Sequence, residues 1–123
     1  MEHAMRIPTH PTLIQRMLDS RLKKVAAAKP VLAASFVSFE IRCGKPSCAC
    51  NHGGPKHRTQ HVTFKEPGQK TRSVFVPKDL IQDVQSWIQE HRRIKQLLHE
   101  IHLLTLAKIR THVQNRRRKH DRP

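Results

Sequence analysis

Aromatic side chains are scarce in this sequence of 123 residues, which has no tyrosine, one tryptophan and four phenylalanines. Proteins that bind single-stranded nucleic acids usually stack the bases on exposed aromatic rings. Phe36, Phe39, Phe64 and Phe75 all lie in segments with strand character, so we expect a sheet core to bury them. The composition therefore disfavours a single-strand binder.

Long apolar runs are also missing. The most apolar early stretch, residues 25–37, is interrupted by Lys29 and Pro30, so it predicts neither a secretory signal nor a membrane span. The three cysteines are an odd number, which argues against a disulfide framework, and an iron–sulfur cluster with four cysteine ligands is excluded. We expect a cytoplasmic protein with no membrane partner.

Acidic residues are few. The chain has nine Asp and Glu but 24 Lys and Arg, which gives a formal net charge of +15. Seven basic residues and one acid give +6 over residues 41–77, and six basic residues and one acid give +5 over residues 110–123. The positive electrostatic potential of such a chain favours a polyanionic partner, above all nucleic acid. A merely solvated basic surface is the alternative.

The three cysteines lie within eight residues, at positions 43, 48 and 50, and His52 and His57 follow them. Three thiolates and one imidazole can complete a tetrahedral zinc shell. Cys43, Cys48 and Cys50 are the predicted metal ligands, with His57 or His52 as the fourth. His57 is favoured because the Gly53-Gly54-Pro55 segment lets it approach from the opposite side, whereas His52 would crowd the cysteines. Reduced thiols without a metal are the alternative.

Catalysis by this zinc is disfavoured. A hydrolytic or deaminating zinc needs an open position and a nearby carboxylate. Glu66 is the only acid between residues 41 and 77, and no His-x-Glu pair precedes the cysteines as in zinc deaminases. We therefore predict a structural zinc ion and no enzymatic activity.

The helices are predicted from apolar periodicity. Residues 1–11 form a flexible leader, and a helix begins at a Thr12/Gln15 capping box and ends before Pro30. Pro77 opens a long amphipathic helix over residues 77–109, followed by a basic tail at 110–123. Residues 12–109 are predicted to form one domain.

Three antiparallel strands are predicted between these helices. The segment 36–42 alternates with Val37, Phe39 and Ile41 on its half-buried side, and it runs directly into Cys43. Segments 58–65 and 71–76 form a hairpin around a turn at 66–69. The predicted fold class is α+β: a helix, a three-stranded sheet with a zinc knuckle between its first two strands, and a long C-terminal helix.

Basic residues around the knuckle, the hairpin and the tail are the candidates for contacts with phosphates, which give affinity without sequence choice. They are Lys45, Lys56, Arg58, Lys65, Lys70, Arg72, Arg116, Arg117, Arg118 and Lys119. Duplex or structured DNA is the predicted partner, and an RNA- or ribosome-associated role is the alternative.

The long helix has more large aliphatic side chains than one contact face needs, which predicts either packing within the chain or pairing with a second copy or partner. The candidate interface residues are Trp87, Ile94, Leu97, Leu98, Ile101 and Leu104. A coiled-coil adaptor is therefore a further alternative.

The pattern Cys43-Gly44-Lys45-Pro46-x-Cys48-x-Cys50, a later His57 and the segment from Lys70 to Lys78 resemble a family of short, uncharacterised bacterial proteins. Those proteins look like the products of accessory genes of mobile elements. Their genes often lie beside genes for transposases or recombinases. The resemblance implies that Cys43, Cys48, Cys50 and His57 act together. It supplies no activity, because that family has none to carry over. Taken with the basic charge, the mobile-element context leads us to predict a nucleoid-associated, non-enzymatic DNA-binding accessory protein with a role in transposition or site-specific recombination.

Overall fold

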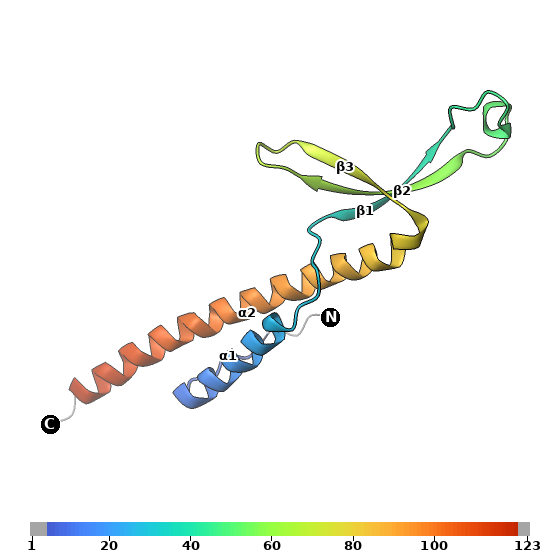
Figure 1. Ribbon diagram of the computed structural model, residues 1–123. Coiled ribbons are helices and arrows are strands. Elements are labelled where there is room, and N and C mark those ends of the chain that lie inside the picture. The colour runs from blue at the N-terminus through green and yellow to red at the C-terminus, as the bar shows by residue number, and fades with distance from the viewer. Residues whose placement is uncertain (1–4, 121–123) are drawn as a thin grey trace. The chain divides into compact units, whose positions relative to one another are not determined.

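The computed structural model describes residues 5–120 and contains two helices and one sheet (Figure 1). The order along the chain is α1 (Pro11–Ala26), β1 (Ser35–Ile41), β2 (His57–Lys65), β3 (Thr71–Val76) and α2 (Ile81–His120), with short 3₁₀ turns at Ala49–Asn51 and Lys78–Leu80. The predicted α+β fold is confirmed. Within the described residues, no helix has the continuous apolar length that a bilayer crossing needs.

Contacts group the elements into two compact units that share α2. One unit contains α1 and the part of α2 from Arg92 onward, and the other extends from Pro30 to His91. We call them the helical unit and the sheet unit. The single domain at residues 12–109 stays a prediction.

The sheet unit has strand order β1-β2-β3, with both neighbouring pairs antiparallel. The β1–β2 register runs from Ser35 opposite Thr63 to Ile41 opposite His57. The turn between β2 and β3 has positive φ angles at Gly68 (90°) and Gln69 (65°). Glycine adopts this conformation without steric cost, which fits the turn predicted here.

One face of the sheet packs on the first turns of α2. Val62 and Val76 form a buried cluster with Val84 and Ile88 of the helix. The half-buried residues around this cluster are Leu32, Ala34, Phe36, Ile81 and Trp87. The Leu32 backbone N–H also donates to the carbonyl of Trp87 at 3.1 Å, which fastens the segment before β1 to the helix.

The prediction of which side of β1 is buried was wrong. Phe39 and Ile41 are 42% and 46% exposed, and Phe75 of β3 is 57% exposed, whereas Phe36 joins the core. Apolar residues occupy both faces of β1, so the alternation of apolar and polar residues does not show which face is buried. The helix packs against the face of Val62 and Val76, and this choice leaves the opposite face to solvent.

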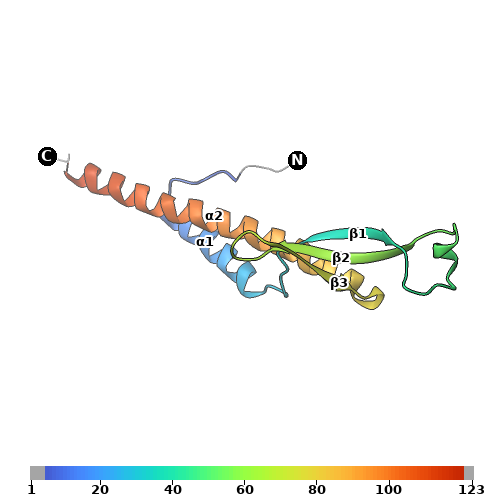
Figure 2. The ribbon, with the colours of Figure 1, turned by 90° about the horizontal axis from the view of Figure 1, so that it is seen from above.

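In the helical unit, α1 lies along α2 (Figure 2). Ile14 and Leu18 pack against Leu104 and Ala107, and the half-buried residues around them are Met5, Ile7, Met17 and Ile101. At the edge of this contact, the Arg21 guanidinium lies 3.2 Å from the Glu100 carboxylate. The apolar residues Ile14, Met17 and Leu18 of α1 therefore pack on the long helix, whereas Leu13 and Leu22 are exposed.

Two helix ends differ from the predictions. His10 caps α1, because its Nδ1 accepts from the Thr12 N–H at 3.2 Å, so the Thr12/Gln15 capping box does not form. Helix α2 begins at Ile81 and continues past residue 109 to His120. Neither glycine nor proline interrupts this stretch, and Arg, Lys and Gln favour helix. The basic tail is therefore helical as far as it is described; residues 121–123 and residues 1–4 of the leader lie outside the described part.

Candidate metal centre

The loop between β1 and β2 lies at one end of the sheet (Figure 1). The last β1–β2 pair joins Ile41 to His57, so the antiparallel register brings the start and the end of the loop together. Cys43 and His57 approach each other for this reason, although they are far apart in the sequence. The 3₁₀ turn at Ala49–Asn51 then turns the chain back so that Cys48 and Cys50 face them.

Four potential ligand atoms meet in this loop. The sulfurs of Cys43, Cys48 and Cys50 and a ring nitrogen of His57 all lie within 4.8 Å of one another. The Cys43 and Cys50 sulfurs are 3.5 Å apart, and the Cys48 sulfur is 3.2 Å from His57 Nε2. Zn–S bonds of about 2.3 Å and Zn–N bonds of about 2.0 Å in a tetrahedron require ligand separations of about 3.5–3.8 Å. The predicted Cys3His cluster is present, and these residues could hold a metal ion.

His52, the other candidate for the fourth ligand, is turned away from the cluster. Its Nε2 lies 2.6 Å from the carbonyl oxygen of Pro46, a contact that engages the ring with the loop backbone. It does not belong to the group of four converging side chains. The geometry therefore favours His57, as chelate spacing predicted.

Backbone and amide hydrogen bonds hold the loop around the cluster. The Asn51 side-chain amide donates to the carbonyls of Cys43 (3.0 Å) and Lys45 (2.8 Å), which ties both ends of the first turn together. The Cys43 N–H points at the Cys50 sulfur, with a distance of 3.4 Å. Such contacts around metal ligands orient them. Asn51 is not among the predicted site residues, although an Asn directly after the last cysteine of a tight turn was the available signal.

The cysteines differ in acidity. The Cys50 backbone N–H and the His57 ring lower the pKa of Cys48 to about 6. For Cys50, the Cys43 N–H acts to lower the pKa, but burial and the neighbouring Cys43 and Cys48 side chains outweigh it and raise that pKa. Cys50 is only 2% exposed, which agrees with the burial effect. A divalent metal ion would offset most of the negative charge that three neighbouring thiolates carry.

Gly54→Ala is predicted to distort the loop. An added Cβ would lie 2.6 Å from the Ala49 oxygen and 2.9 Å from its carbonyl carbon, and the Gly54 N–H donates to that same oxygen at 2.8 Å. We expect a loss of about 1–3 kcal/mol in unfolding free energy, as for other overpacked sites, and weaker zinc retention against a chelator. Gly44→Ala is the matched control, because nothing lies within 4 Å of its added Cβ. Equal stability and zinc retention in both variants would contradict the prediction.

The predicted phosphate-binding residues belong to both units. In the sheet unit, Arg58 lies 3.5 Å from the Glu40 carboxylate and Arg72 lies 3.1 Å from that of Glu66, and both pairs are exposed. The predicted lysines of this unit, Lys45, Lys56, Lys65 and Lys70, are also exposed. In the helical unit, Arg116, Arg117, Arg118 and Lys119 are exposed on the last turns of α2.

Most of the predicted interface residues of α2 pack against other parts of the same chain. Leu97 and Leu104 are buried, and Trp87 and Ile101 pack beside the two cores. Ile94 is half-buried, and Leu98 is 55% exposed. Leu98 is thus the member of this set that presents most of its surface to solvent.

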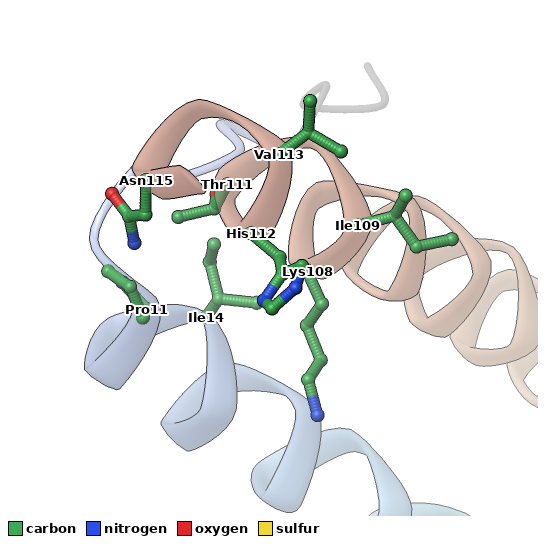
Figure 3. Close-up of a pocket in the computed structure, with 8 residues that line it drawn as sticks. All are labelled: Pro11, Ile14, Lys108, Ile109, Thr111, His112, Val113 and Asn115. Carbon is green, nitrogen blue, oxygen red and sulfur yellow. The ribbon is translucent and has the colours of Figure 1, made fainter. Parts of the chain in front are cut away.

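A hollow of about 440 Å³ lies between the start of α1 and the last turns of α2 (Figure 3). Ile14, Ile109 and Val113 give it a largely apolar lining, and Lys108 and His112 are the titratable side chains on its wall. None of the predicted metal-binding or phosphate-binding residues lines it. The metal cluster is therefore the candidate site that the structure supports.

Comparison with known proteins places the chain in a family but assigns it no activity. No curated protein and no solved structure matches it. A family model described as a domain of unknown function, DUF6788, matches residues 14–86, which is more than half of the chain. The matched segment begins in α1, contains the whole sheet with its Cys3His loop and ends in the first turns of α2. The chain therefore belongs to the DUF6788 family, whose function is unknown.

Proposed function

We propose that this protein is a non-enzymatic DNA-binding protein of the bacterial nucleoid, in which a structural zinc ion holds the basic sheet unit in shape. The observation that carries the proposal is the Cys3His cluster at the end of a sheet unit whose residues 41–77 have a net charge of +6. A metal centre on a small basic fold provides a rigid, positively charged surface.

The donor set supports a structural rather than a catalytic ion. Four protein ligands fill a tetrahedral shell, whereas a catalytic zinc keeps a position open for water or substrate. The carboxylates nearest in sequence, Glu40 and Glu66, are not part of the cluster, and each lies beside an arginine. Among the described residues, the cluster thus contains no carboxylate that could act as a general acid or base toward a zinc-bound water.

The charge supports a phosphate backbone as partner. Three thiolates on Zn²⁺ carry a formal charge of −1, so the metal loop and the hairpin, residues 41–77 with a net charge of +6, stay positive when zinc is bound. Exposed lysines lie at both ends of the sheet, with Lys45 and Lys56 in the metal loop and Lys65 and Lys70 at the hairpin. Their long, exposed side chains suit contacts that neutralise phosphates without reading the bases.

The cysteine motif supports a more specific role, as an accessory protein of a mobile element in transposition or site-specific recombination. The pattern from Cys43 to Cys50 resembles short bacterial proteins of that kind. In this role the exposed Leu98 of α2 would contact a recombinase, a transposase or a second copy of this chain.

The DNA-binding proposal predicts a steep salt dependence. If four to six phosphates are neutralised, the logarithm of the affinity for a duplex should fall against log salt with a slope of about −4 to −5. Fluorescence anisotropy with a labelled 30-base-pair duplex, between 50 and 300 mM salt, measures this slope. A structured RNA of similar length is the comparison. No duplex binding at 100 mM salt would contradict the proposal, and tighter RNA binding would favour the RNA-associated alternative.

A further inference from the structure

The solvent-facing side of the sheet carries three rings in a row across all three strands. Phe39 of β1, His61 of β2 and Phe75 of β3 lie on this side, opposite the face that packs on α2. The ring centroids of Phe39 and His61 are 5.2 Å apart, and those of His61 and Phe75 are 5.7 Å apart. Two of the four phenylalanines, Phe39 and Phe75, thus lie on the surface. Packing of the core does not explain their position.

His61 holds the row in place. One ring nitrogen lies 3.1 Å from the Thr59 hydroxyl and the other lies 3.3 Å from the Ser73 hydroxyl, so both edges of the imidazole are engaged. Its plane makes angles of 68° and 71° with the planes of Phe39 and Phe75. Each phenyl ring therefore has the imidazole as a steeply inclined neighbour, while Phe39 and Phe75 keep 42% and 57% of their surface exposed.

The surroundings suit a flat, negatively charged ligand with apolar faces. The strand register puts Val37, Thr63 and Ser73 on the same side of the sheet, and these short side chains leave the rings prominent. Arg58, with its partner Glu40, and Arg72 belong to the opposite side, and Lys65 lies on the ring side next to the hairpin turn. With +6 over residues 41–77, an anionic ligand is favoured over an uncharged apolar one.

We infer that this face binds single-stranded DNA, with unpaired bases stacked on Phe39 and Phe75 and phosphates near the surrounding lysines. The inference deepens the proposed function and rests on its claim that the protein binds DNA. Bases offer π faces whatever their sequence, and rings on a sheet surface inside a basic field are the usual means of holding them. The reason for disfavouring a single strand, burial of all four phenylalanines, does not hold for Phe39 and Phe75.

The test compares binding of a labelled 20-nucleotide oligo-dT and of a duplex of the same length by the full chain and its variants. Phe39→Leu and Phe75→Leu keep apolar bulk but remove the ring, so each should weaken oligo-dT binding about five- to a hundredfold. The slope against log salt should not change, because no phosphate contact is removed. Phe75→Tyr should bind like the parent. Val74→Ala is the matched control, since Val74 is an exposed neighbour that pairs with Val62 on the other side of the sheet.

The outcomes separate this inference from the proposed function. Duplex binding without oligo-dT binding, or oligo-dT binding that both leucine variants retain, would overturn the stacking surface and leave the DNA-binding proposal standing. Failure to bind either DNA would overturn both. Tighter binding of oligo-U than of oligo-dT would overturn the assignment to DNA. Unchanged circular dichroism and zinc content in the leucine variants are expected, because both rings are exposed.

Discussion

A Cys48→Ser variant is expected to purify with almost no zinc and with the sheet unit largely unfolded. Serine hydroxyls do not replace thiolates on zinc, and the loop that contains Cys48 has only a short 3₁₀ turn and a few hydrogen bonds of its own. Zinc binding in such a loop contributes directly to the folding free energy. Trp87, the only tryptophan, packs on the core of the sheet unit, so its fluorescence reports unfolding of that unit. We therefore expect Cys48→Ser to lack the cooperative Trp87 transition that heating produces in the parent protein.

His52→Ala is the matched control for this experiment. His52 lies in the same loop, but its ring contacts the Pro46 carbonyl and not the three sulfurs. This variant should keep one zinc per chain and lose only a small part of the stability. If Cys48→Ser keeps its zinc and the Trp87 transition of the parent protein, Cys48 is not a ligand. Loss of zinc from His52→Ala alone would make His52 the fourth ligand.

Replacing Arg116, Arg117, Arg118 and Lys119 with alanine is expected to weaken duplex binding by about one to three orders of magnitude at 0.1 M salt. Successive helical residues point about 100° apart, so two or three of the four can face one phosphate backbone. Each lost contact should make the salt slope less negative by about 0.9. Alanine favours helix, so α2 should stay helical. Titrations at several salt concentrations, on two unrelated duplex sequences, measure both effects.

A charge-preserving variant controls for side-chain identity. Changing Arg116, Arg117 and Arg118 to lysine keeps the charge of the tail, and the salt slope should stay close to that of the parent protein because counterion release depends on charge. The alanine variant should lose affinity equally for both duplexes, since phosphate contacts do not read sequence. A salt slope that is unchanged in the alanine variant would move the interface away from the tail.

The metal loop and the sheet were predictable because local signals agree. Three cysteines within eight residues, with glycine and proline between them, leave few chemical alternatives to a metal site. The choice of His57 followed from the reach of the Gly53–Pro55 segment. The hairpin was marked by a period of two on both sides of Pro67 and Gly68, and the structure has β2 and β3 close to the predicted bounds.

The buried side of the sheet was not predictable from β1 alone. Phe36 and Val37 are adjacent and both apolar, so either face of the strand could have met the helix. The decision came from tertiary packing of Val84 and Ile88 of α2 against Val62. Helix ends depended on similar details: the imidazole of His10 replaced the expected threonine cap, which is an uncommon use of histidine.

The metal content of the parent protein shows whether a structural zinc ion holds the loop between β1 and β2. Protein purified without a histidine tag and without added zinc should contain one zinc ion per folded chain, by elemental analysis and by native mass spectrometry. A chelator strong enough to remove the ion should shift the fluorescence of Trp87 to that of an exposed side chain, and added zinc should restore it. A fully folded sample without bound metal would show that the Cys3His loop folds without zinc and that no structural ion holds the sheet unit in shape.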